Sequence, residues 1–219
     1  MLRSVWLLFL IVFSSAHADD PFWKSKAKVY ERVQQGEVIV SVNAHDITPK
    51  KPHMDLDIKG GGHVPAPCSF VYAESRKYEQ VARYSDYVKE AKFNPDTNQM
   101  RVKISAFGFS RELTMAITVI ADRDTEFRLL DGPMPGFWWR SQMTEFKPGV
   151  CEIAMTGGYK YDEFPIPRFF LEFGMEVIFK RMAQQMRSHV MALYHGGKTA
   201  GQGDGRHERI LSNFMALGE

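Results

Sequence analysis

The sequence has little net charge, few cysteines and none of the common phosphate-binding or nucleophile motifs. Its 28 Lys and Arg residues almost balance its 26 Asp and Glu residues, so the formal net charge is +2. Such a weak field does not favour binding to nucleic acid. No Gly-x-Ser-x-Gly elbow, Walker loop or Gly-x-Gly-x-x-Gly fingerprint occurs, which removes the usual sequence indications of a hydrolase, an NTPase or a dinucleotide-binding enzyme. We expect no cofactor.

The first 18 residues have the pattern of a secretory signal peptide. Arg3 is followed by an apolar run from Val5 to Phe13, and Ala16-His17-Ala18 provides a small-x-small cleavage site. The run is too short to cross a bilayer, which takes about 20 residues. We therefore predict that residues 1–18 are removed, that the mature chain begins near Asp19, and that the protein is periplasmic or secreted.

Three further parts follow the signal segment. Residues 19–35 carry apolar residues at loosely helical spacing among lysines, which predicts an N-terminal helical segment. Residues 36–195 form the main domain, which is long enough for one sizeable core. Residues 196–219 begin as a Gly-rich linker and end in a short amphipathic tail. That tail is either loosely packed on its own domain or forms a transient contact with a membrane or a partner protein.

The middle of the main domain reads as a series of strands separated by turns. After two strands before residue 60 and a helix that begins near Pro65, the predicted strands cover residues 87–93, 99–107, 111–120, 126–130, 137–146 and 150–159. Met100, Val102 and Ile104 show the alternation, because each lies between polar residues. The short spacings leave no room for helices between strands, so an antiparallel meander is expected.

The longest periodic segment runs from Pro165 to Leu193. Apolar residues recur every three or four positions along it, which predicts one long helix with an apolar stripe. Gly196-Gly197 is expected to end this helix. The stripe residues are Leu171, Met175, Ile178, Met182, Met186, Val190 and Leu193. The predicted fold class is therefore α+β, with a curved antiparallel sheet gripping a long C-terminal helix.

A group of His and Asp residues lies near the first two strands. Imidazole and carboxylate side chains at this density could bind zinc. Their spacings match no compact ligand motif, and such residues are common on exposed strands, so we predict no metal site. The residues are His45, Asp46, His53, Asp55, Asp57 and His63.

This arrangement resembles that of the START-like proteins, also called helix-grip or polyketide-cyclase-like proteins. The resembling segments are residues 65–72 (PAPCSFVY), 84–88 (YSDYV), 132–139 (GPMPGFWW) and 164–170 (FPIPRFF). The resemblance covers roughly residues 36–193 and is one of pattern more than of identity. It implies a hydrophobic ligand, such as a lipid, quinone, sterol or polyketide, held between sheet and helix; some members of the family are enzymes.

The resemblance suggests three functions. The first is a periplasmic binding or carrier protein for a lipid-like small molecule. The second is a cyclase or hydrolase using the same cavity, with Arg140, Tyr72 or Tyr159 as inward polar groups. The third is an interaction module with a filled core and no cavity. We favour binding, because no convincing acid–base pair is present and we assign no catalytic residue. The predicted ligand-binding residues are Met115, Ile117, Phe127, Trp139, Arg140, Met143, Met155, Met175, Ile178 and Met182.

The same resemblance implies a disulfide between Cys68 and Cys151. In the resembling fold, the strand before the first helix lies antiparallel to the last strand, which brings the region after His63 close to the region near Val150. Two thiols in an oxidising compartment often pair. The alternative is two separate buried thiols, because Cys151 shares the inward phase of Ile153 and free cysteine is commonly buried.

Overall fold

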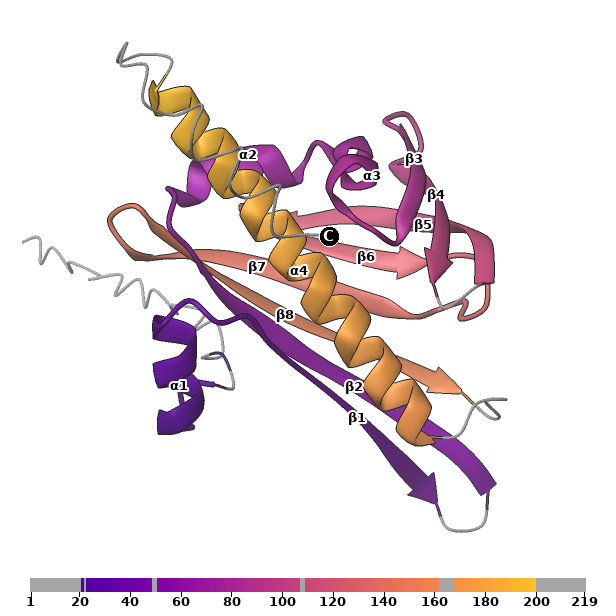
Figure 1. The fold of residues 1–219 in the computed structure, drawn as a ribbon. Coiled ribbons are helices and arrows are strands. Elements are labelled where there is room, and N and C mark those ends of the chain that lie inside the picture. The colour runs from indigo at the N-terminus through magenta and orange to yellow at the C-terminus, as the bar shows by residue number, and fades with distance from the viewer. Residues whose placement is uncertain (1–20, 22, 49–50, 107–108, 162–167, 200–219) are drawn as a thin grey trace, which may run out of the picture.

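The computed structural model describes residues 21, 23–48, 51–106, 109–161 and 168–199. The elements in chain order are α1 (Ala27–Gln34), β1 (Ile39–Thr48), β2 (Lys51–Val64), α2 (Cys68–Ser75), the 3-10 turn η1 (Tyr78–Gln80), α3 (Val81–Tyr84), β3 (Val88–Asn94), β4 (Gln99–Ala106), β5 (Phe109–Ala121), β6 (Asp124–Leu129), β7 (Trp138–Lys147), β8 (Val150–Tyr161) and α4 (Arg168–Thr199). These strands form one sheet in the order β1-β2-β8-β7-β6-β5-β4-β3 (Figure 1). All neighbouring strands are antiparallel. The predicted α+β fold class is confirmed.

The main core lies between the sheet and α4, which crosses one face of the curved sheet (Figure 1). Leu171 of α4 is buried there, and Met175 and Met182 pack against the same cluster. The predicted apolar stripe of the helix therefore faces the sheet, except at its last residue, Leu193, which is 41% exposed. The predicted alternation along the strands also holds in this core, whose buried strand residues include Val40, Val42, Leu56, Ile58, Met100, Val102, Leu113, Met115 and Ile117. Val119, whose place in the alternation continues the row of Met115 and Ile117, is 49% exposed near the register shift at the end of β5.

The disulfide between Cys68 and Cys151 is present, with a Cα–Cα distance of 4.7 Å. Its position follows from strand pairing, because Val64 of β2 lies opposite Cys151 of β8 and Cys68 begins the next helix. Both cysteines are fully buried in a small cluster that also contains Val190 of α4. The bridge therefore joins α2 to the sheet at the same place where α4 packs.

The segment before β1 covers the other face of the sheet. Trp23, Val33 and Ile39 form a buried cluster there, with Ala154 of β8 packed against it. Gly61 allows this close approach, because a Cβ on it would lie 2.4 Å from Cη2 of Trp23 and 2.0 Å from the Ile153 carbonyl oxygen. Its φ of +151° also disfavours any other residue.

The ends of two helices differ from the prediction. The N-terminal helix begins at Ala27, because the preceding turn buries Trp23 against the sheet instead of continuing the helix. Helix α4 continues through Gly196 and Gly197 to Thr199. Glycine weakens a helix by about 1 kcal/mol without necessarily ending it, and the last turns are held by a contact between the rings of Tyr194 and Phe70, whose centroids are 5.2 Å apart.

Two predicted segments lie outside the described residues, namely the signal peptide 1–18 and most of the C-terminal tail. Within the part of the chain that the structure describes, no helix is long and apolar enough to cross a membrane.

Candidate ligand-binding site

A cavity of about 400 Å³ lies between the sheet and α4, and we call it the inner cavity. This volume is in the range of small-molecule binding sites. Most of its wall is apolar, with many methionine and aromatic side chains. The wall includes Val38, which precedes β1, Val40 of β1, Met100 and Val102 of β4, Met115 of β5, Phe127 of β6, Trp139 and Met143 of β7, Ile153 and Met155 of β8, and Met175, Ile178, Phe179, Met182, Ala183 and Met186 of α4.

The structure places most of the predicted ligand-binding residues in this wall. They are Met115, Phe127, Trp139, Met143, Met155, Met175, Ile178 and Met182. Ile117 is not in the wall and instead belongs to the surrounding core, where it is 6% exposed. Phe127 and Trp139 stack with ring centroids 4.9 Å apart, and Phe179 of α4 meets Trp139 edge-on at 6.2 Å.

Arg140 lies on the opposite face of the sheet. Its neighbour Trp139 points into the inner cavity, and successive side chains of a strand point to opposite faces. Its Nε donates to Oδ1 of Asp124 at 2.7 Å, and a second guanidinium nitrogen pairs with Oδ2. These hydrogen bonds, with one from Gln142, lower the pKa of Asp124. Arg140 is thus held in an ion pair away from the inner cavity, which corrects its predicted role.

The polar residues of the inner cavity wall are Tyr72, Tyr78, Tyr84, Tyr87, Ser75, Thr125, Ser141, His63, Arg76 and Arg187. Burial raises the pKa of Tyr84 to about 12 and also raises the pKa of Tyr78, so both are neutral at pH 7. Tyr72 also lies in the wall, whereas Tyr159 packs in the core beside Phe137. All the residues of this wall are described by the structure, and none is a carboxylate. The cavity can therefore enclose an apolar molecule and donate hydrogen bonds, but its wall contains no carboxylate to act as a general base.

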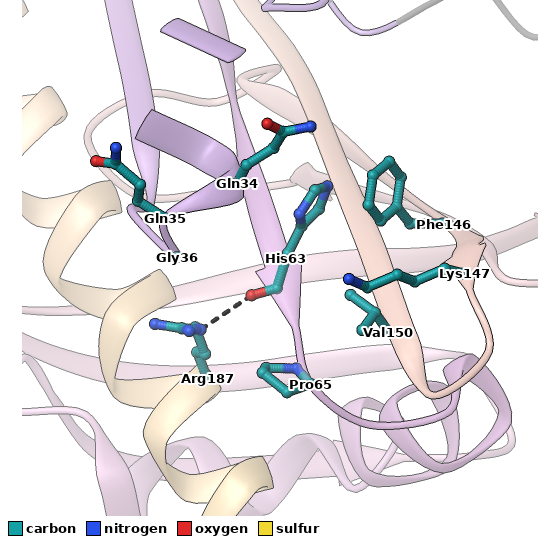
Figure 2. Close-up of a pocket in the computed structure, with 9 residues that line it drawn as sticks. All are labelled: Gln34, Gln35, Gly36, His63, Pro65, Phe146, Lys147, Val150 and Arg187. Atoms are coloured by element: carbon teal, nitrogen blue, oxygen red, sulfur yellow. Dashed lines mark hydrogen bonds between the residues drawn. The ribbon is translucent and has the colours of Figure 1, made fainter. Parts of the chain in front are cut away.

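A second pocket of about 560 Å³, which we call the outer pocket, opens beside the inner cavity. It lies between the C-terminal end of α1, the end of β2, the β7–β8 turn and α4 (Figure 2). Lys147 and Arg187 lie on opposite sides of it, with His63 between them (Figure 2). Its remaining wall residues are Gln34, Gln35, Gly36, Pro65, Phe146 and Val150. His63 and Arg187 also belong to the wall of the inner cavity, so the two spaces adjoin.

His63 is engaged with residues outside the His and Asp group that was considered as a zinc site in the sequence. It pairs across the strands with Glu152, whose Oε2 lies 3.2 Å from His63 Nε2, and Glu152 also binds Lys24 at 3.1 Å. This cluster lies under the segment before α1. The described residues contain no group of three His, Cys, Asp or Glu side chains placed to hold a metal ion. The side chains of Asp46 and His53 lie outside the described part of the chain.

Sequence reasoning missed Arg187 as a site residue. Its helical phase placed it on the exposed face of the long helix with Lys180 and Arg181. In the structure, Arg187 Nε donates to the His63 carbonyl oxygen at 2.9 Å, which turns the side chain toward β2. No motif in the sequence marks this contact, since it depends on how α4 crosses the sheet.

The chain matches no protein-family model and no curated protein sequence. Its fold, however, is shared by solved structures. A START superfamily protein from Mycobacterium smegmatis superposes with a TM-score of 0.55 at 14% identity, over 63% of this chain and 98% of that one. The Zhui aromatase/cyclase from a Streptomyces species superposes with a TM-score of 0.56 at 11% identity, over 68% and 99%. The di-domain ARO/CYC StfQ gives 0.54 at 12% identity, over 65% of this chain and 52% of that one.

This chain therefore has the START-like helix-grip fold. At these identities the similarity establishes the fold alone.

Proposed function

We propose that this protein is a periplasmic binding or carrier protein for a hydrophobic, lipid-like small molecule. The observation that carries the proposal is the inner cavity, which is lined by apolar side chains from both the sheet and α4. Enclosing a ligand there removes its apolar surface from water, at about 25 cal/mol per Å². Methionines on both walls suit ligands of varied shape, because the side chain is flexible and polarisable.

Two further features support this function. Two solved structures with the same fold are an aromatase/cyclase and a di-domain ARO/CYC by name. The resemblance to START-like proteins implies a hydrophobic ligand, which agrees with a cavity of this kind. The Cys68–Cys151 disulfide suits an oxidising compartment such as the periplasm. The predicted signal peptide at residues 1–18 suits the same location. A contact of the C-terminal tail with a membrane or a partner protein stays a prediction.

The other two readings of the sequence have less support. An interaction module with a filled core would not need a cavity of about 400 Å³. A cyclase or hydrolase would need inward polar groups that act on the ligand, and of the three candidates only Tyr72 lies in the wall. Binding is therefore the better-supported function.

The direct test is native mass spectrometry of protein purified from the periplasm of its own host. We expect a bound small molecule that dissociates on denaturation. The matched pair of variants is Ala183→Phe, which places a ring in the inner cavity, and Ser188→Phe, which places the same ring on the exposed side of α4. We expect Ala183→Phe to lower the affinity for a fluorescent lipid at least tenfold, and Ser188→Phe to leave that affinity unchanged. A protein free of bound molecules that also binds no fluorescent lipid would contradict the proposal.

A further inference from the structure

The wall of the outer pocket carries two cations and no carboxylate. All nine wall residues are described by the structure, and among them Lys147 and Arg187 carry formal positive charge. Among the residues that the structure describes, no carboxylate pairs with either cation, so the pocket has a positive charge that these residues leave unpaired.

The carboxylates next to the wall residues are mostly engaged elsewhere. Three of them are held by other cations or by backbone N–H groups, and turning toward the outer pocket would cost those contacts. They are Glu37, held by Arg32 and Lys180; Glu152, held by Lys24 and His63; and Glu145, held by the backbone N–H groups of Cys68 and Gly149. The fourth, Glu31, is exposed and accepts a hydrogen bond from Nε2 of the wall residue Gln35 at 3.5 Å.

Arg187 is fixed at the boundary between the outer pocket and the inner cavity. Its Nε donates to the His63 carbonyl oxygen at 2.9 Å, and both residues belong to both walls. Gly36 leaves room for the guanidinium, since a Cβ there would lie 3.0 Å from Nη2. An apolar space of about 400 Å³ thus ends at a positioned cation that borders a polar space. An anionic amphiphile is complementary to this arrangement, with its hydrocarbon chain in the apolar space and its negative charge beside the cation.

We propose that the outer pocket binds the anionic head group, a carboxylate or a phosphate, of an amphiphile whose hydrocarbon chain lies in the inner cavity. The inference rests on the proposed function and names its ligand class. Arg187 is the main contact, because a guanidinium donates two parallel hydrogen bonds to a carboxylate or phosphate. Lys147 adds a point charge from the β7–β8 turn. Arg76, which also lines the inner cavity, is instead placed 5.8 Å from the centroid of the Tyr72 ring and contributes no head-group contact.

The experiment compares two ligands of equal chain length, hexadecanoate and hexadecanol, in displacing a neutral environment-sensitive dye from the delipidated protein. The wild type should bind hexadecanoate at least tenfold more tightly than hexadecanol, which is within the range of charge-assisted hydrogen bonds to a fixed cation. Arg187→Gln should abolish this preference while leaving the affinity for hexadecanol within twofold. Lys147→Gln should reduce the preference in part, and Arg187→Lys should retain part of it. Arg181→Gln, which removes an exposed arginine of α4 that lies outside both walls, is the matched control and should retain the full preference. Arg76→Gln tests whether the head group lies instead at the other arginine of the inner cavity.

The outcomes separate this inference from the proposed function. If the wild type binds neither ligand, both fail. If it binds both equally, or if Arg187→Gln keeps the preference, the inner cavity binds lipid but the head-group site is wrong. A preference lost in Arg76→Gln would place the head group at the other arginine and overturn the assignment. The last ligand measured is inorganic phosphate. If it binds as tightly as hexadecanoate and this binding is lost in Arg187→Gln, the outer pocket is a site for free anions and the head-group assignment is wrong. Unchanged melting temperatures of the variants exclude misfolding as the cause.

Discussion

The disulfide is the feature whose contribution to stability can be worked out most directly. Cys68 and Cys151 are 83 residues apart in sequence, so the bridge closes a long loop in the unfolded chain. The loss of chain entropy for a loop of this length corresponds to about 4.5 kcal/mol at 25 °C, and measured values are typically about 2–4 kcal/mol. We therefore expect the double variant Cys68→Ala/Cys151→Ala to lose between about 2 and 4.5 kcal/mol of unfolding free energy.

Alanine is the suitable replacement because both positions are fully buried among apolar neighbours. A serine hydroxyl would need a hydrogen-bond partner in that cluster, and its desolvation would add an unrelated cost. For a chain of this size, each kcal/mol shifts the melting temperature by about 2–4 °C, so a decrease of about 4–18 °C is expected. The unfolded state also expands without the bridge, which should increase the denaturant slope m.

The assay is urea unfolding followed by tryptophan fluorescence, with and without reductant. Reductant should lower the stability of the wild type to near that of the double variant and should leave the variant itself unchanged. A loss below about 1 kcal/mol, or a variant that responds to reductant as the wild type does, would refute the reasoning. Either result would mean that the bridge does not constrain the unfolded chain.

Three other substitutions test the fold. Gly61→Ala should cost at least about 2 kcal/mol, because its Cβ would collide with Trp23 and with the Ile153 carbonyl oxygen, whereas Gly174→Ala, in the open on α4, should gain up to about 1 kcal/mol; urea unfolding measures both. Asp124→Asn should lose about 1 kcal/mol at pH 7, a value kept small because Arg140 is partly exposed. Since folding lowers the pKa of Asp124, its contribution is present above its usual pKa near 4 and is lost as the pH falls through the lowered value. Stability curves of the wild type and Asp124→Asn should therefore converge below about pH 4, and a constant difference would argue against this ion pair.

The parts of the fold that local periodicity controls could be predicted from the sequence. Met100 and Val102 alternate with charged residues, and Met175 and Met182 recur at helical spacing, so their buried faces follow from the period alone. The pairing of the strand before α2 with the last strand does not follow from periodicity. It came from the resemblance to START-like proteins, which thereby brought Cys68 close to Cys151.

The site residues that were misplaced depend on contacts distant in sequence. Arg140 follows the run Phe137-Trp138-Trp139, which hides the alternation, and its partner Asp124 lies across the β6–β7 pair. The exposed face predicted for α4 divides into two flanks in the structure. Lys180 and Arg187 on one flank reach the α1–β1 connection and the end of β2, whereas Arg181 on the other reaches Asp86. Which flank a residue belongs to depends on the angle at which α4 crosses the sheet, and this angle cannot be predicted from the periodicity of the sequence.

The polar contacts of these two flanks explain why the inner cavity stays open beneath the apolar, sheet-facing side of α4. Polar contacts hold α4 at both edges, with Glu172 accepting from the Ala44 N–H at 2.7 Å on one edge and Gln185 accepting from the Asp86 N–H at 3.3 Å on the other. If α4 moved toward the sheet to fill the space, these hydrogen bonds would be distorted, and a lost hydrogen bond costs about 0.5–1.5 kcal/mol. The height of the helix is thus fixed at its edges, while part of its apolar face borders the inner cavity. In the proposed function, the ligand packs against that part of the face without displacing the helix.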